Sequence, residues 1–90
     1  MLEYQIERTL MNKVKALGGL ALKLLSPSMN GLPDRLVLLP GGRCLFVELK
    51  APGQKMRPLQ LKRAEQLREL GFQVFCIDDI EDARLPEFLR

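Results

Sequence analysis

The sequence predicts one small layered domain of the α/β or α+β kind, in which helices flank a mixed sheet. Three observations lead to this expectation. Apolar residues at helical spacing open the chain, two apolar runs joined by a glycine turn follow in its middle, and a second helical segment leads to a last apolar run. The expected order is helix, strand, strand, strand, helix, strand, and a hairpin joined through a helix to a further strand gives a mixed sheet.

The first two elements are a helix and a short strand. Apolar side chains recur every three or four residues from residue 3 to about residue 17, at Ile6, Leu10, Val14 and Leu17. This spacing is typical of an amphipathic helix, which the two glycines at 18–19 end. Residues 20–25 form an apolar run between glycine and Ser-Pro, and predict a strand with Lys23 turned toward solvent or substrate.

A hairpin follows a polar loop. Residues 26–33 are rich in Ser, Pro, Asn and Gly and predict a loop. The apolar runs 35–39 and 43–50 are separated by Pro-Gly-Gly at 40–42, which is typical of a turn between two antiparallel strands. Both strands are expected to be largely buried.

The last part of the chain predicts a helix and a strand. Residues 51–57 form a basic, glycine-containing loop, and Pro58 suits the first position of a helix that ends at Gly71. The apolar residues of this helix are Leu59, Leu67 and Leu70. Residues 72–77 alternate and then run apolar, as a last strand does, and the tail from Asp78 holds a short helical turn at most.

Length and composition bound the class of protein. Ninety residues, 47% of them hydrophobic and 28% charged, fit a single globular domain over 1–90. A core of this size is marginal, so burial of a further face in a homodimer is expected to help. The sequence has no long apolar segment and no signal-like start, so we expect no membrane partner and an intracellular, soluble protein, in a bacterial or phage-infected host cytoplasm.

The net charge and the cysteines limit which binding partners, disulfides and metal sites the chain can have. The 14 basic and 11 acidic residues give a net charge of +3, a weak indication of a polyanionic partner. Cys44 and Cys76 fall in apolar strand segments, where a reduced thiol acts as a small hydrophobe, so no disulfide is expected. The chain has no histidine and no closely spaced cysteine pair, which argues against a structural zinc site.

Two carboxylates and an ammonium are expected to meet at one end of the hairpin. Asp34 begins the first strand and Glu48 and Lys50 end the second, so antiparallel pairing brings them close. Glu48 and Lys50 share a face, while Leu49 points to the other and keeps its carbonyl near the site. Adjacent carboxylates repel unless a cation lies between them, and oxygen ligands of this kind suit Mg²⁺ or Mn²⁺.

A purely structural interpretation competes with this one. Asp34 would cap the loop, and Glu48 and Lys50 would form a solvated pair worth a fraction of a kcal/mol. A Glu-x-Lys tripeptide on a strand is common by chance, but its combination with Asp34 across a hairpin is much rarer.

The same residues resemble a known family, the PD-(D/E)XK nucleases, and within it the small stand-alone VRR-nuclease (VRR-NUC) domains of phages. Residues 31–34, Gly-Leu-Pro-Asp, match its Gly-x-Pro-Asp signature, residues 48–50, Glu-Leu-Lys, match (D/E)-x-Lys, and Gln60 matches a family glutamine. The resemblance covers nearly the whole chain. It implies an α/β, restriction-endonuclease-like core of order αβββαβ, with Asp34, Glu48 and the Leu49 carbonyl on the metal and Lys50 beside the attacking water.

The resemblance also implies an acidic metal ligand on the first helix and a role for the glutamine. Glu7 is the expected ligand, because Glu7-Arg8-Thr9-Leu10 is similar to the Glu-Arg-x-Leu start of archaeal junction resolvases. Glu3 lies one turn earlier on the same face and is the alternative. Gln60, on the first turn of the second helix, is expected to bridge the lysine or a scissile phosphate.

The basic residues are expected to contact phosphates, because few aromatic residues accompany them. The predicted nucleic-acid-binding residues are Lys23, Arg35, Lys55 and Arg57, within a wider basic set that adds Arg43, Lys62 and Arg63. The expected function is a metal-dependent, structure-selective DNA endonuclease, similar to a Holliday-junction resolvase and acting as a homodimer. The alternatives are a flap or restriction-like DNA nuclease of the same fold, an RNA-cutting relative, and a non-catalytic basic nucleic-acid-binding module.

Overall fold

The computed structural model describes residues 2–85. Within this range the elements are α1 (Glu3–Ala16), β1 (Leu20–Lys23), β2 (Arg35–Leu39), β3 (Arg43–Leu49), α2 (Pro58–Glu69), β4 (Gln73–Ile77) and α3 (Ile80–Ala83). The predicted order is confirmed, and the expected helical turn after Asp78 is α3. None of these helices has the length and apolar character needed to cross a membrane. The part of the predicted domain beyond residue 85, together with Met1, lies outside the described residues.

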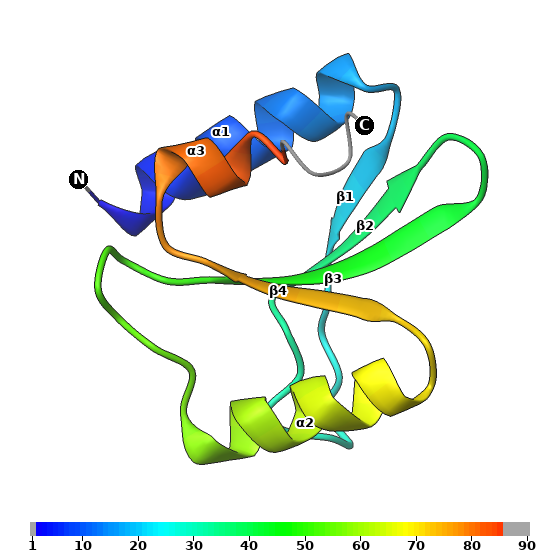
Figure 1. The fold of residues 1–90 in the computed structure, drawn as a ribbon, viewed down its shortest axis with the longest axis vertical. Coiled ribbons are helices and arrows are strands. Elements are labelled where there is room, and N and C mark those ends of the chain that lie inside the picture. The colour runs from blue at the N-terminus through cyan, green and yellow to red at the C-terminus, as the bar shows by residue number, and fades with distance from the viewer. Residues whose placement is uncertain (1, 86–90) are drawn as a thin grey trace.

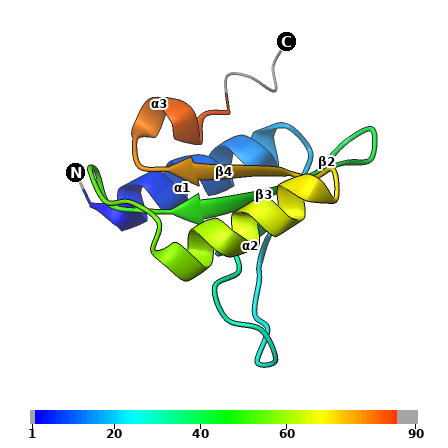
Figure 2. The same cartoon turned by 60° about the horizontal axis from the view of Figure 1, so that its bottom comes forward.

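The four strands form one mixed sheet in the order β1-β2-β3-β4. The first three strands are antiparallel neighbours, and β4 returns through α2 to pair parallel with β3. In Figure 1, α1 and α3 lie on one side of the sheet and α2 on the other, and Figure 2 shows the same layers from below. The predicted mixed sheet flanked by helices is therefore confirmed.

β1 is shorter than predicted. The run 20–25 was expected to be extended throughout, but the strand ends at Lys23, and Leu25 is 77% exposed. The Leu24 amide still donates to the Asp34 carbonyl at 2.8 Å. The register places Leu25 opposite Pro33, which belongs to the loop before β2 and not to the strand, so Leu25 has no strand residue to pair with.

The main core lies between α1 and one face of the sheet. Ile6, Leu10 and Val14 are almost fully buried, as the helical spacing predicts, and Leu17 packs against them half-buried. The sheet contributes apolar side chains that alternate along its strands, together with two residues from α3 and the turn after it. This side of the core comprises Val37, Leu39, Leu45, Val47, Leu49, Ile77, Ala83 and Leu85.

α2 does not pack on the sheet through the leucines named above. Its buried residues are Gln60 and Ala64, whereas Leu59 is 41% exposed and Leu70 73% exposed. Ala64 is fully buried, and its small side chain allows the helix to lie close to the sheet at β4. The helix thus presents a polar and a small residue to the sheet, and its leucine side stays largely outside.

The loop between β1 and β2 is held against α2 by Gly31. This glycine has a φ of 86°, and a Cβ added there would lie 2.7 Å from Leu59 Cγ and 3.1 Å from the Leu59 carbonyl oxygen. The loop can approach the helix this closely only without a side chain at residue 31.

We expect Gly31→Ala to lower the free energy of unfolding by roughly 2–4 kcal/mol, because it adds a steric clash with α2 to the strain of a positive φ. Gly41→Ala is the matched control, since Gly41 has a φ of 83° with no atom within 4 Å of an added Cβ. Its expected loss is about 1–2 kcal/mol from the backbone alone. Urea denaturation of the two variants measures the difference, and equal losses would mean that the loop does not depend on close contact with α2.

Candidate active site

The hairpin places Asp34 beside the end of β3. Arg35 pairs with Val47 in the sheet register, so the residues before and after them, Asp34 and Glu48, come opposite one another. The Asp34 carboxylate also accepts a hydrogen bond from the Leu49 amide, with Oδ2 3.0 Å from the nitrogen. The turn at 40–42 therefore brings the two carboxylates close together, as the antiparallel pairing of the two strands predicts.

Glu48 is a buried acid held by two neighbours. Its side chain is 3% exposed, and its Oε2 atom lies 2.8 Å from Gln60 Nε2 and 3.3 Å from Lys50 Nζ. Its other oxygen, Oε1, is buried and accepts no hydrogen bond from residues 2–85. Burial raises the pKa of the Glu48 carboxyl, the nearby Asp34 charge raises it further, and Lys50 opposes both effects.

The buried Oε1 atom makes a cation site chemically reasonable. An acceptor oxygen in the protein interior without a partner is unusual and calls for a donor or a cation. The negative charge of the nearby Asp34 makes it more favourable for a positive ion to bind beside Glu48. Carboxylate and carbonyl oxygens are the donors that Mg²⁺ and Mn²⁺ favour. The chemistry of these donor groups thus fits such a metal.

Gln60 lies between the first turn of α2 and the end of β3. Its Nε2 atom donates to Glu48, and its Oε1 atom accepts from the Arg57 amide at 2.9 Å, which satisfies the first turn of α2. Gln60 was expected to bridge the lysine or a phosphate, but in this structure its amide nitrogen reaches the carboxylate instead. It therefore fixes the orientation of Glu48.

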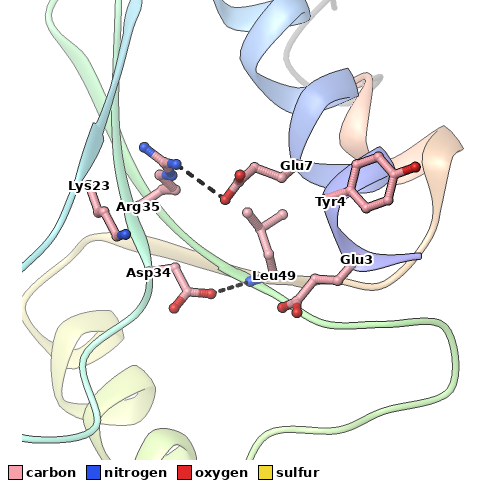
Figure 3. Close-up of a pocket in the computed structure, with 7 residues that line it drawn as sticks. All are labelled: Glu3, Tyr4, Glu7, Lys23, Asp34, Arg35 and Leu49. Atoms are coloured by element: carbon pink, nitrogen blue, oxygen red, sulfur yellow. Dashed lines mark hydrogen bonds and ion pairs between the residues drawn. The ribbon is translucent and has the colours of Figure 1, made fainter.

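The helix-1 carboxylates line a pocket on the other side of Asp34. Glu3, Glu7, Asp34 and Leu49 border this pocket of about 270 Å³, together with Tyr4, Lys23 and Arg35 (Figure 3). Glu7 turns to Arg35, with Oε2 3.2 Å from a guanidinium nitrogen. Glu3 has no such partner drawn in Figure 3. Both candidates for the helix-1 ligand thus lie at the pocket.

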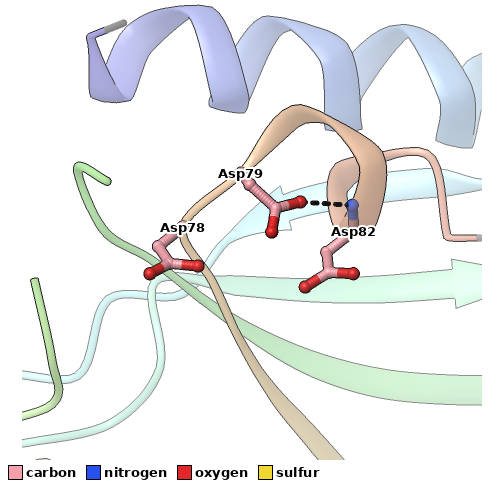
Figure 4. Close-up of side chains that lie close together, drawn as sticks. All are labelled: Asp78, Asp79 and Asp82. Carbon is pink, nitrogen blue, oxygen red and sulfur yellow. Dashed lines mark hydrogen bonds between the residues drawn. The ribbon is translucent and has the colours of Figure 1, made fainter. Parts of the chain in front are cut away.

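The predicted ligands do not converge on one point in this structure. Among residues 2–85, three acidic side chains bring oxygens within 4.8 Å of one another at Asp78, Asp79 and Asp82, after β4 (Figure 4). Glu7, Asp34 and Glu48 form no such group, because Arg35 holds Glu7, the Leu49 amide holds Asp34, and Gln60 and Lys50 hold Glu48. Exposed acidic groups like the one after β4 are common without an ion.

The predicted nucleic-acid-binding residues occupy two places. Lys23 is exposed at the pocket and pairs in register with Arg35, which is 14% exposed and bound to Glu7. Lys55 and Arg57 are exposed on the loop before α2. Sequence reasoning missed the Glu7–Arg35 ion pair and the position of Tyr4 at the pocket. The spacing of Glu3, Tyr4 and Glu7 on one helix face was the available signal for Tyr4.

Comparison with known proteins finds relatives that cover most of the chain. No protein-family model matches the sequence. The protein described as "Putative nuclease p44" of Acyrthosiphon pisum secondary endosymbiont phage 1 is 49% identical over 76 residues, which are 84% of this chain and 82% of that protein. A solved structure described as a VRR_NUC domain superposes with a TM-score of 0.84 at 35% identity, covering 90% of this chain and 88% of that one. Both similarities extend over most of the domain.

We expect Glu48→Gln to stabilise the metal-free protein at neutral pH. A carboxyl whose pKa rises on folding binds its proton more tightly in the folded chain, so its charged form destabilises that chain. Wild type therefore loses stability as the pH rises from the ordinary value of 4.5 through the raised pKa of Glu48. Glu48→Gln should have the higher melting temperature above this range, and the difference between the two proteins should vanish as the pH falls to 4.5.

Thermal unfolding of both proteins in chelator, across this pH range, measures the effect. Glu65→Gln, an exposed change on α2, is the control and should leave the melting temperature unchanged. A large loss of melting temperature in Glu48→Gln at every pH would show that Glu48 is mainly a structural partner of Lys50 and Gln60.

Proposed function

The chain belongs to the VRR_NUC family of nuclease domains, with the PD-(D/E)XK fold, and we propose that it hydrolyses phosphodiester bonds in DNA with Mg²⁺ or Mn²⁺. The observation that supports this most directly is the buried Glu48 carboxylate, with one oxygen unpartnered, between Asp34 and Lys50. An acid this deeply buried on a strand end is costly to keep unless a cation or a reacting group uses it.

The proposed metal ligands are Asp34, Glu48, the Leu49 carbonyl and Glu7, with Glu3 as the alternative on α1. A divalent cation bound there supplies positive charge that polarises the phosphate and lowers the pKa of a water. Glu7 becomes available only when its carboxylate leaves Arg35. That exchange frees the Arg35 guanidinium for a phosphate oxygen beside the pocket.

Lys50 and Gln60 have different proposed roles. Lys50 follows β3 directly, and its amide donates to the Ile77 carbonyl at 3.0 Å, which fixes its backbone to the adjacent strand. Its ammonium is thus held near Glu48, where it orients the attacking water and offsets the negative charge that grows on the phosphate in the transition state. Gln60 acts through Glu48 as a positioning residue.

We expect Asp34→Asn, Glu48→Gln and Lys50→Ala each to lower the cleavage rate by at least about 10²-fold while DNA binding stays nearly unchanged, since each removes a metal or water contact. Glu65→Gln and Lys15→Ala are matched controls, because both residues are exposed and lie away from the pocket. The assay follows a labelled DNA with Mg²⁺, Mn²⁺ or chelator. Full turnover by any of the three variants would remove that residue from the site, and unchanged cleavage in chelator would exclude the metal.

We further propose that the substrate is branched DNA, such as a four-way junction, and that the enzyme acts as a homodimer. Support comes from the basic residues, which lie on separate elements around the site rather than in one base-reading element. Lys23 is on the edge strand at the pocket, and Lys55 and Arg57 are on the loop before α2. Such contacts recognise the path of the phosphate backbone and not the base sequence. Two identical sites in a dimer can cut two strands.

Binding should weaken steeply as salt rises from about 50 to 200 mM, because basic groups replace counterions on the phosphates. The double variant Lys55→Ala, Arg57→Ala should reduce the slope of log K against log salt by about two units. Competition between labelled junction and unlabelled DNA tests the shape preference. If linear duplex displaced the junction as well as a second junction did, a flap or restriction-like nuclease would replace the junction-selective proposal.

A further inference from the structure

Tyr4 lies at the rim of the pocket that the proposed metal ligands line. Within residues 2–85 it is the only aromatic residue that borders this pocket, and it is 54% exposed. Figure 3 shows its ring on α1 beside Glu3 and Glu7, with the hydroxyl pointing away from Asp34. The hydroxyl is therefore not directed at the reacting phosphate, and the ring is left to contact the nucleotide next to that phosphate.

The ring of Tyr4 is held in place before DNA binds. The guanidinium carbon of Arg8 lies over the ring, 5.7 Å from its centroid, which is within the range of a cation–π contact. The start of α1 is fixed as well, because the Leu2 amide donates to Gln5 Oε1 at 2.8 Å and Ile6 is fully buried. A side chain that is ordered in advance loses little conformational entropy when a planar group stacks on it.

The charges around the pocket indicate which part of a nucleotide meets Tyr4. Lys23 and Arg35 border the pocket from the sheet, where their positive charges attract phosphate. Glu3 and Glu7 border it from α1, next to the ring, where negative charge repels any phosphate that no cation binds. A nucleotide in the pocket is thus oriented with its phosphate toward the sheet and its uncharged base toward the ring. Bases of every kind stack favourably on aromatic side chains.

The size of the pocket favours an unpaired base. Its volume of about 270 Å³ lies just below the range of small-ligand pockets, which begins at roughly 300 Å³, so the pocket can hold one nucleotide unit and not a base pair. A base within a duplex must leave its stack to reach such a site. The free-energy cost of that step is smallest for a base that is already unpaired.

We infer that Tyr4 stacks on an unpaired base next to the scissile phosphate, and that this contact selects DNA whose branch point offers such a base. The inference rests on the proposed nuclease function and deepens it, because it names the part of a branched DNA that the enzyme recognises. Tyr4 is a specificity-determining residue in this proposal. The cleavage chemistry stays with Asp34, Glu48 and Lys50.

Cleavage of two four-way junctions that differ in one group tests the contact. Both carry one extra unpaired nucleotide at the branch point, and in one of them this nucleotide is abasic. We expect wild type to cleave the junction that has the base with a kcat/KM at least about fivefold higher, because stacking on the ring stabilises the bound base. This ratio should fall to about one in Tyr4→Leu and stay close to that of wild type in Tyr4→Phe, which keeps the ring. The same ratio in wild type and Tyr4→Leu would overturn the inference.

Binding in chelator separates this contact from catalysis. 2-Aminopurine at the unpaired position loses fluorescence when it stacks, so the saturated complex with Tyr4→Leu should be at least about twofold brighter than the complex with wild type. Lys50→Ala, which keeps Tyr4, should match wild type. Equal brightness of the wild-type and Tyr4→Leu complexes would exclude the stacking contact. A difference in brightness without cleavage by wild type in Mg²⁺ or Mn²⁺ would instead contradict the proposed nuclease function and leave the contact in place.

Discussion

The hydrogen bond from Gln60 to Glu48 joins the end of the hairpin to the first turn of α2, and much of the structure depends on it. It gives a buried carboxylate one of its two polar contacts, and the Lys50 ammonium provides the other, which offsets its charge. Because the Gln60 oxygen also accepts from the Arg57 amide, a single side chain both begins the helix and orients the acid. A change at any of these groups therefore affects the position of the helix and the charge of the site together.

β3 serves the core and the site at once. Leu45, Val47 and Leu49 alternate toward the packed face beneath α1, and Glu48 lies between the last two on the opposite face. A shift of one residue in the pairing of β3 would move Glu48 into that core and expose its leucines. The apolar contacts that stabilise the domain thus also fix which carboxylate lies at the candidate site.

Much of this arrangement can be predicted from the sequence, because it depends on residues that are close together in the chain. The glycine turn at 40–42 fixes the hairpin, and counting from it brings Asp34 to Glu48. The side of α2 that faces the sheet cannot be predicted in this way. Its buried residues are one glutamine and one alanine, which are much less apolar than the three leucines on the other side of the helix. The Glu7–Arg35 pair joins residues 28 positions apart, and no local pattern specifies it. The choice of Glu7 over Glu3 stays a prediction, because both residues lie at the pocket.

The parallel pairing of β3 with β4 bears on the order in which the chain can fold. The β2–β3 hairpin closes over a three-residue turn and can form within microseconds, whereas β4 must wait until the whole α2 crossover has collapsed. Asp34 and Glu48 therefore come together early, and Gln60 reaches them only with the crossover. During that interval water solvates the two acids, and their desolvation accompanies the last long-range step of folding. We therefore expect the complete candidate site to form only with this last step of folding.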